Sequence, residues 1–404
     1  MRVYYFIKNY AVNISLKYLK GTNMRSKITN LIISLVIFLS FIEALEIILR
    51  LTHIFGAHTS FYKHDPVLGY RYIPNSKYWF FEENDHPIIG KINSYGWRDK
   101  GWSLKKPENT FRIAILGDSM VASLDVESDR SFVAITERQL NKNENRSIEL
   151  MNFGFLNISQ AEELLILQND VVKFSPDMVV LFFFPVNDID DMSKETASHL
   201  NRPFFNISES GELILDTSFS QTRHYKIKSS LDWFKQHSAL ITLIGERYYG
   251  FKEQRRSKTV DMSEAKDKKP LQRFLSLCTE NPDALFLKNY QLNKTLIKAM
   301  SEYCKNKCIK FILVTVDVPS YNPEIEKRYK SKDTTFNAKF FENDLRNYAE
   351  SLNIGYLGLQ SIFQQIYKDT GLSLHWIHWN YQGHKVVADV LTNKLKSIIE
   401  PNQQ

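Results

Sequence analysis

The chain has 404 residues, of which 43% are hydrophobic, so it can bury one large domain or two modest ones and is not a disordered chain. Its formal net charge is +7, but basic and acidic residues are interleaved instead of forming a basic stripe, which argues against a nucleic-acid partner. The three cysteines, Cys278, Cys304 and Cys308, exclude a fully paired disulfide framework and lack the neighbours of a zinc site. We expect buried thiols or one disulfide, and neither a metal nor a cofactor.

The first predicted element is an apolar segment over residues 28–51, long enough for the roughly 20 residues of a membrane-spanning helix. Five basic residues and no acidic one lie between positions 8 and 27, which predicts a cytoplasmic tail over residues 1–27 and the remainder outside the cytoplasm. Glu43 and Glu46 lie toward the far end, where they can reach the interface or a partner helix. A cleaved signal peptide and a buried soluble helix are the alternatives, and no small-x-small cleavage motif supports the first.

Residues 52–110 are rich in aromatic, Pro, Asn and Gly residues and show no sustained helical period, which predicts an extended lead-in packed on the following domain. Residues 111–400 alternate short β-branched runs with amphipathic helical segments. The predicted strands are 111–116, 147–153, 177–184, 310–316 and 355–359, and the predicted helices lie near 129–141, 159–173, 288–306 and 381–398. This order predicts an α/β fold, a flavodoxin-like three-layer α/β/α sandwich with a central five-stranded parallel sheet.

An insertion over about residues 191–287 interrupts this alternation and is far longer than an ordinary connection. It contains a possible hairpin around 207–214 and an aromatic-rich helix near 229–249. A charged run over 251–269 is typical of a solvated loop, although a contact with a partner or glycan stays open. We expect the insertion to form a cap over the functional site.

Polar residues follow the first and third predicted strands, at the sheet edge where parallel α/β folds bind ligands. Gly117 permits a tight turn that presents Ser119, and an amide in such a turn can face a developing oxyanion. Alone, the triplet around Asp118 is more often a helix cap. Asn187 and Asp188 follow the third strand, and the Asn187 amide could donate to an oxyanion or simply cap a turn.

The segment HWIHWNYQGH (375–384) opens the last predicted helix and places His378 at a loop-to-helix junction. A lone histidine there would usually be structural. Here its imidazole could reach the end of the first strand, and the chain order of serine, asparagine and histidine argues against coincidence.

GDSM after the first strand, N-x-G after the second, NDxxD after the third and HWNxxGH at the last helix together resemble the ordered blocks of the SGNH (GDSL) hydrolase superfamily. The resemblance spans roughly residues 110–398, and HDPVLGY and NSYGWRD before it resemble the lead-in of anchored members. It implies that Ser119 is the nucleophile and His378 its general base. It also implies an oxyanion hole made of the Ser119 amide, a backbone amide of the second block and the Asn187 side chain, with Asp118 and Asp188 in support.

Two positions depart from the family pattern. The family usually has Asp three residues before the catalytic histidine, but this chain has His375, so the orienting group could be His375 itself, Asp369 folding back or a backbone carbonyl. In the second block the family glycine aligns with Asn157, while Gly154 occupies an earlier position. Asparagine tolerates the left-handed backbone, so the Asn157 amide could still donate.

The resemblance therefore predicts ester hydrolysis through an acyl-enzyme on Ser119, without metal or cofactor. We expect an ester-bearing small molecule or an acylated glycan, such as an O-acetylated envelope polysaccharide or exopolysaccharide, as substrate. Four tryptophans could stack on sugars, although aromatic residues are more often part of a core: Trp97, Trp102, Trp376 and Trp379. Trp376 and Trp379 are the better candidates, because they flank His378. An O-acyltransferase of the same fold and a binding or assembly protein with an impaired site are the alternatives, and the oligomeric state stays open.

Overall fold

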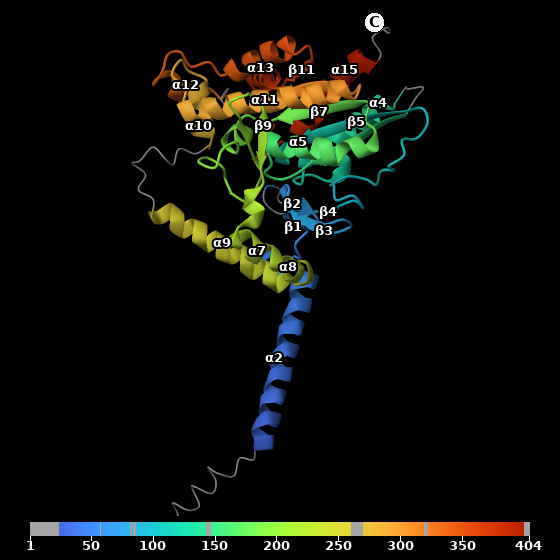
Figure 1. Cartoon of the computed structure of the whole chain (residues 1–404), viewed down its shortest axis with the longest axis vertical. Helices are drawn as coiled ribbons and strands as arrows, with labels where there is room; N and C mark the ends of the chain where they lie inside the picture. Colours follow the sequence, from blue (N-terminus) through green and yellow to red (C-terminus); the bar gives the residue numbers. More distant parts are fainter. Residues whose placement is uncertain are drawn as a thin grey trace, which may run out of the picture.

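A computed structural model describes residues 24–56, 58–80, 83, 86–142, 147–259, 270–318 and 322–399. Most of the predicted tail, and the charged run beyond residue 259, lie outside the described residues. Figure 1 shows a long helix at one end, a small layer of hairpins and helices above it, and a larger α/β body at the other end. The predicted site belongs to the body.

The N-terminal helix is α2 (Met24–Thr52). Its segment Ser26–Thr52 is long and apolar enough to cross a membrane, and none of its most apolar window is buried against the rest of the protein (0%). The prediction of an apolar N-terminal helix is therefore confirmed. Glu46, near its end, accepts hydrogen bonds from the amides of Ala239 at 2.7 Å and Leu240 at 3.0 Å, so this carboxylate meets a partner helix as expected.

The body is built on a five-stranded parallel sheet with strand order β11-β10-β7-β5-β6. Its strands are β5 (Thr110–Gly117), β6 (Ser147–Gly154), β7 (Met178–Phe183), β10 (Lys310–Thr315) and β11 (Gly355–Gly358). The chain runs from β5 to its neighbour β6, then crosses to β7 on the other side of β5 and continues outward to β10 and β11. This is the flavodoxin-like order. The predicted three-layer sandwich is confirmed.

Both faces of the sheet are buried, because side chains that alternate along each strand enter two different apolar cores. Ala114 and Leu116 of β5 belong to one core, whereas Ile113 and Ile115 belong to the other. The first face is covered by α5 (Gln160–Asn169), α11 (Ala284–Asn306) and α13 (Phe340–Ser351), and the second by α4 (Phe132–Leu140), α14 (Gln360–Thr370) and α15 (Tyr381–Ile399). The short helix α12 (Pro323–Lys330) has no buried residue.

The lead-in forms two antiparallel hairpins instead of a plain extended segment. Strand β1 (Tyr62–Asp65) pairs with β2 (Gly69–Tyr72), and β3 (Lys77–Phe80) pairs with β4 (Ile88–Lys91). Tyr78 and Trp97 are buried in the same core as one face of the body's sheet. The lead-in is therefore packed on the body.

The insertion contains the expected hairpin, formed by β8 (Phe204–Ile207) and β9 (Leu213–Asp216). In place of one aromatic-rich helix it has α7 (Arg223–Ser230), α8 (Asp232–His237) and α9 (Ala239–Thr259), followed by α10 (Pro270–Leu277). The break before α9 falls at Ser238, whose backbone is extended. Helix α7 contacts β1 and α9 contacts α2, so these helices lie beside the lead-in at the α2 end of the molecule (Figure 1).

The three cysteines are free thiols, of which Cys278 and Cys304 are buried and Cys308 is exposed. Burial raises the pKa of Cys278 and of Cys304 to about 12, so both thiols stay protonated at neutral pH. Among the described residues, no group of three His, Cys, Asp or Glu side chains is placed to hold a metal ion.

Candidate active site

Ser119 is the first residue of the one-turn helix α3 (Ser119–Ala122), which begins directly after β5. A Cβ on Gly117 would lie 2.4 Å from Val121 Cγ2, so only glycine fits the turn. The Asp118 carboxylate caps the helix by accepting from the Met120 amide at 2.9 Å. Because the first amides of a helix have no partner within it, the Ser119 amide is positioned to donate to a bound anion.

His378 is presented by a tight turn before α15. The Trp376 amide donates to the His378 carbonyl at 2.8 Å, and the buried indole of Trp379 donates to Asp317 Oδ1 at 3.0 Å. This anchored turn places His378 Nε2 2.8 Å from Ser119 Oγ. The structure thus brings the predicted nucleophile and base into hydrogen-bond contact.

The other ring nitrogen of His378 is bound by a carboxylate that the sequence did not point to. His378 Nδ1 hydrogen-bonds to Glu83 Oε1, and Glu83 Oε2 accepts from the backbone amides of Ile377 at 3.1 Å and His378 at 2.7 Å. The Glu83 side chain is only 1% exposed. Since a carboxylate can only accept, Nδ1 carries the proton and Nε2 is free to accept from the serine hydroxyl.

Glu83 also sets the basicity of the imidazole. Burial by itself lowers the pKa of His378, because it disfavours the charged ring. The hydrogen bond to Glu83 and its charge act in the opposite direction, and the more distant charges of Asp125 and Asp118 add to them. The net effect is a His378 pKa raised above its ordinary value, which suits a group that must accept a proton from serine.

The two side chains predicted to orient His378 lie elsewhere, and these predictions are wrong. His375 Nε2 lies 3.3 Å from Asp317 Oδ2, on the anchoring side of the turn. Asp369 is exposed near the end of α14 and accepts from Gln365 at 2.7 Å. Glu83 lies 295 positions before His378 in the β3–β4 loop, and its only sequence signal was a pair of glutamates in an aromatic-rich segment.

Asn187 begins α6 (Asn187–Asp190), directly after β7, and is half-buried at the same sheet edge as Ser119. Burial raises the pKa of Asp118 to about 6, although the Met120 amide favours its charged form. His378 and the nearby Asn187 side chain also favour the charged form. The Asn187 side chain therefore lies beside the residue that precedes Ser119.

The two candidate positions of the second block differ. Asn157 has a left-handed backbone with φ 55°, as expected from its residue type, and its carbonyl accepts from Arg202 at 3.2 Å. The Gly154 amide is already bound to Asn152 Oδ1 at 2.8 Å, so the prediction of Gly154 as an oxyanion donor is wrong. A Cβ on Gly154 would lie 2.3 Å from the Ala122 nitrogen, so this glycine instead lets β6 pack against the helix that carries Ser119.

Asp188 is fully buried behind Asn187. Its Oδ2 accepts from the Phe184 amide at 2.7 Å and from Gln160 Nε2 at 2.8 Å. Burial, with the charge of Asp118, raises the pKa of Asp188 well above its ordinary value. Asp188 therefore shapes the turn that presents Asn187.

The tryptophans differ from expectation. Trp97, Trp102 and Trp379 are 3%, 6% and 0% exposed, so the prediction that they stack on sugars is wrong. Trp376 is 36% exposed beside His378, and its ring packs edge-on against Tyr381 at 5.3 Å. Of these four rings, Trp376 is the one that a ligand can reach.

A search against protein-family models and curated protein sequences finds no match. Among solved structures, the chain aligns with a lipolytic protein of the G-D-S-L family from Desulfitobacterium hafniense, with 14% identity over 70% of this chain and 98% of that one and a TM-score of 0.35. It also aligns with a lipase/acylhydrolase from Enterococcus faecalis, with 15% identity over 73% and 100% of the two chains and a TM-score of 0.38.

A third alignment is with an acetylxylan esterase from Geobacillus stearothermophilus, with 12% identity over 70% of this chain and 94% of that one and a TM-score of 0.39. Similarity at this level does not define a reaction, so the chemistry has to come from the site. The site combines an α/β/α sandwich with a Ser–His–Glu chain at the carboxyl edge of its sheet, an arrangement that serine hydrolases share on several folds.

Proposed function

We propose that the protein is a serine ester hydrolase in which Ser119 is the nucleophile, His378 the general base and Glu83 the orienting acid. The observation that carries this proposal is the continuous hydrogen-bond chain from Ser119 Oγ through both nitrogens of His378 to the buried Glu83 carboxylate. Such a chain fixes the tautomer that a base needs and stabilises the imidazolium that forms.

In the proposed reaction, His378 Nε2 takes the hydroxyl proton as Ser119 Oγ attacks the ester carbonyl. The oxyanion accepts hydrogen bonds from the Ser119 amide, the Asn187 side chain and the Asn157 amide. The tetrahedral intermediate collapses, the ester C–O bond breaks, and His378 returns its proton to the leaving alcohol. A water molecule, deprotonated by the same imidazole, then attacks the acyl-enzyme and releases the acid and Ser119.

The proposed substrate is an O-acetyl or other carboxyl ester carried by an envelope polysaccharide or exopolysaccharide outside the cytoplasm. Three features support this class: α2 has the length of a membrane anchor, basic residues precede it, and the exposed Trp376 and Ile377 flank the base. An acyltransferase would use the same acyl-enzyme and differ only in its acceptor. Glu83 supplies the acid whose absence at His375 was one of the two reasons, with Asn157, for considering an impaired binding protein.

The proposal is tested with the full-length protein in detergent and a chromogenic acetyl ester. Ser119→Ala and His378→Ala should each lower kcat/KM by about 10³-fold or more, with folding checked by circular dichroism. Ser397→Ala, on the exposed surface of α15, is the matched control and should behave as wild type. Hydrolysis that survives in Ser119→Ala would contradict the assignment, and ester transfer to an added sugar in preference to water would favour the transferase.

A further inference from the structure

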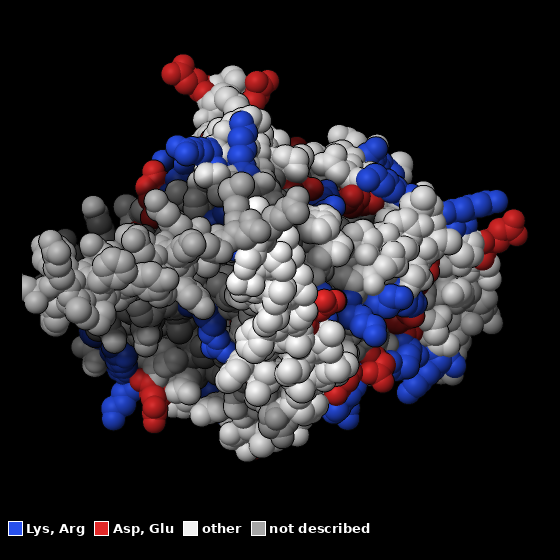
Figure 2. All heavy atoms as spheres, turned by 90° about the horizontal axis from the view of Figure 1, so that it is seen from below, with Lys and Arg blue, Asp and Glu red and all other residues white. Residues whose placement is uncertain are grey.

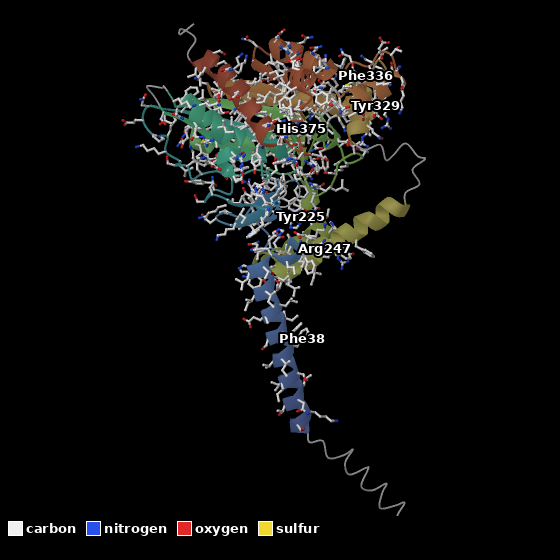
Figure 3. The ribbon with its side chains drawn as sticks, turned by 180° about the vertical axis from the view of Figure 1, so that it is seen from behind. Phe38, Tyr225, Arg247, Tyr329, Phe336 and His375 are labelled. Atoms are coloured by element: carbon white, nitrogen blue, oxygen red, sulfur yellow. The ribbon has the colours of Figure 1, made fainter. Side chains whose placement is uncertain are left out.

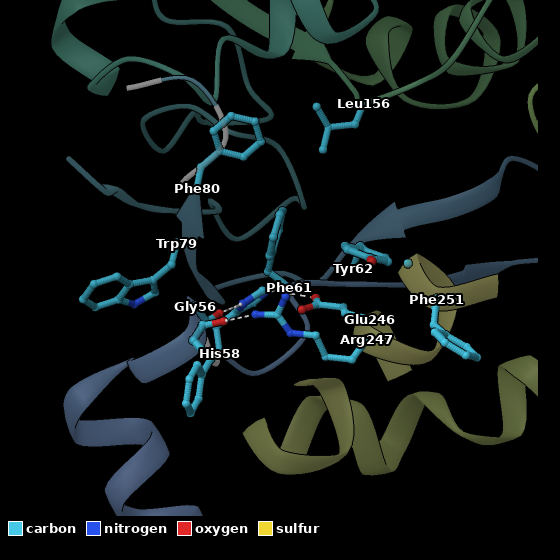
Figure 4. A pocket seen from close by; sticks show the side chains of 12 residues that line it. Gly56, His58, Phe61, Tyr62, Trp79, Phe80, Leu156, Glu246, Arg247 and Phe251 are labelled. Carbon is cyan, nitrogen blue, oxygen red and sulfur yellow. Dashed lines mark hydrogen bonds and ion pairs between the residues drawn. The ribbon is translucent and has the colours of Figure 1, made fainter. Parts of the chain in front are cut away.

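A cavity of about 730 Å³ lies between the end of α2, helix α9 and the lead-in hairpins (Figures 1 and 4). Its wall is dominated by aromatic and aliphatic side chains, including Phe55, Phe61, Trp79, Phe80, Leu156 and Phe251. A cavity of this size and lining is suited to an apolar ligand.

The charged side chains in the wall are engaged by other protein groups. Arg247 donates to the Phe55 carbonyl at 3.0 Å, and Glu246 lies 3.6 Å from His58 Nε2. These contacts tie α9 to the segment that follows α2, as the dashed lines of Figure 4 show. The cavity therefore offers a ligand mainly apolar surface.

The inner end of the cavity is lined by two residues, Phe80 and Leu156, that lie close in the chain to residues of the proposed catalytic site. Leu156 lines it and directly precedes Asn157, whose Cα is therefore about 3.8 Å from that of Leu156. Phe80 lines it as the last residue of β3, three positions before Glu83. Figure 4 shows Phe80 and Leu156 at the end of the cavity opposite α9.

The outer end opens among exposed apolar side chains. Phe55 is 70% and Phe251 is 54% exposed. Phe251 belongs to a row on α9 whose spacing of three, four and three residues places it on one helix face. The row consists of Ile241, Ile244, Tyr248 and Phe251, all exposed.

This row has a fixed relation to α2. The Glu46 carboxylate of α2 accepts from the first amides of α9, so α9 crosses the end of the long helix (Figure 1). In Figure 3, Arg247 of α9 lies at the end of α2, whereas His375 lies in the body. Viewed from the α2 side, the apolar side chains of α2 occupy the centre of the picture, and charged side chains lie around them (Figure 2). With α2 across a bilayer, the row on α9 lies at the membrane surface.

We propose that this cavity binds the hydrocarbon chain of a lipid-anchored ester drawn from the bilayer, with its polar, ester-bearing part directed toward Ser119. The inference rests on the proposed esterase function and narrows its substrate to membrane-bound amphiphiles. Each CH₂ group that is buried adds to the affinity, so the cavity can select long-chain molecules over soluble ones.

The test fills the cavity from α9. Gly250 lines it, and a Cβ there would meet no atom within 4 Å, so Gly250→Phe adds an aromatic ring where space exists. Gly101, where a Cβ is equally unobstructed, provides the control Gly101→Phe outside the cavity. The full-length proteins are placed in nanodiscs that contain a phosphatidylglycerol with a diazirine in one acyl chain. After irradiation, labelling of Gly250→Phe should fall about ten-fold, equivalent to about 1.4 kcal/mol, while Gly101→Phe labels as wild type.

Two further readouts keep the outcomes separate. In the wild type, mass spectrometry should place the adduct on β3 or the Gly250–Phe251 region, which does not depend on any variant folding. The ratio of palmitoyl-ester to acetyl-ester hydrolysis should fall in Gly250→Phe and not in Gly101→Phe. Labelling that maps elsewhere, or that Gly250→Phe leaves unchanged, would overturn the inference. Cavity labelling without ester hydrolysis by the wild type would support the lipid site and contradict the esterase.

Discussion

The α/β body and the lead-in contribute to the site in different ways. The body supplies Ser119, Asn187 and His378, each at the junction of a regular element with a turn, and each within a recognisable sequence block. The lead-in supplies Glu83 from a hairpin loop that carries no such block. The nucleophile is placed by a strand end and the base by a turn before a helix, whereas the acid is placed by the packing of one region on another.

The lead-in is attached at both of its sides. Tyr78 of β3 is fully buried against the body, and Trp79 next to it stacks on His53 at the end of α2, with ring centroids 3.5 Å apart. Strand β3, which precedes Glu83 in the chain, is therefore held between the catalytic body and the helix with membrane-spanning length. This arrangement makes the acid the part of the site most dependent on tertiary structure.

Beyond loss of the nucleophile or the base, the largest expected effect comes from removing the lead-in's contribution, Glu83. Glu83→Gln keeps the side-chain shape but not the charge, and should lower kcat by about 10⁴-fold, because the imidazolium loses its stabilising partner and the tautomer is no longer enforced. Steady-state kinetics on a chromogenic acetyl ester measure this. Asp369→Asn is the control and should stay within about two-fold, since that carboxylate only meets Gln365 on the surface.

The body's contribution is tested next. Asn187→Ala should lower kcat by about 10²- to 10³-fold with little change in KM, because an oxyanion donor acts mainly in the transition state. The same kinetic assay applies, with thermal unfolding as a check of the fold. A change confined to KM would mean that Asn187 binds the ground-state substrate instead.

Gly154→Ala probes the packing that places Ser119. The added methyl group would lie 2.3 Å from the Ala122 backbone nitrogen, and this backbone cannot move aside without shifting α3. We expect a loss of about 1–3 kcal/mol in the free energy of unfolding, measured by urea denaturation. A fully stable variant would show that β6 and α3 can separate, and the account of Gly154 would then fail.

His375→Asp tests whether a carboxylate three residues before His378 can take over the role of Glu83. The new carboxylate would face Asp317, which is buried and lies 3.3 Å from the His375 ring, so we expect a loss of roughly 1–2 kcal/mol in stability from like-charge repulsion. Combined with Glu83→Gln it should not restore activity. Recovery of even a tenth of wild-type kcat in the double variant would show that the body can hold its own acid.

The smallest expected effect is a shift of the pH profile. The base works only when His378 is neutral, and its raised pKa means that kcat/KM should fall as pH decreases through a value above the ordinary histidine pKa. In Glu83→Gln the largest interactions that raise the His378 pKa are removed, while burial, which lowers it, and the weaker effects of Asp125 and Asp118 remain, so the residual activity should persist to lower pH. An unshifted acid limb would mean that another group sets it.

The sequence by itself determined the order of strands, the apolar N-terminal helix and the pairing of Ser119 with His378. These follow from local patterns: apolar runs define buried parallel strands, and parallel strands bring the residues after them to one edge. It also indicated that Asn157 would adopt a left-handed backbone, because that preference belongs to the residue itself.

Only the tertiary structure decided which acid orients His378 and that the Gly154 amide is already hydrogen-bonded to Asn152. It also decided that three of the four tryptophans considered for sugar stacking are buried. Each depends on which distant segment packs against the residue. Glu83 and His378 are 295 positions apart, and no local propensity relates two residues at that distance. Burial and long-range hydrogen bonding are properties of the assembled chain, so the residues that complete the site appear only when the lead-in is packed on the body.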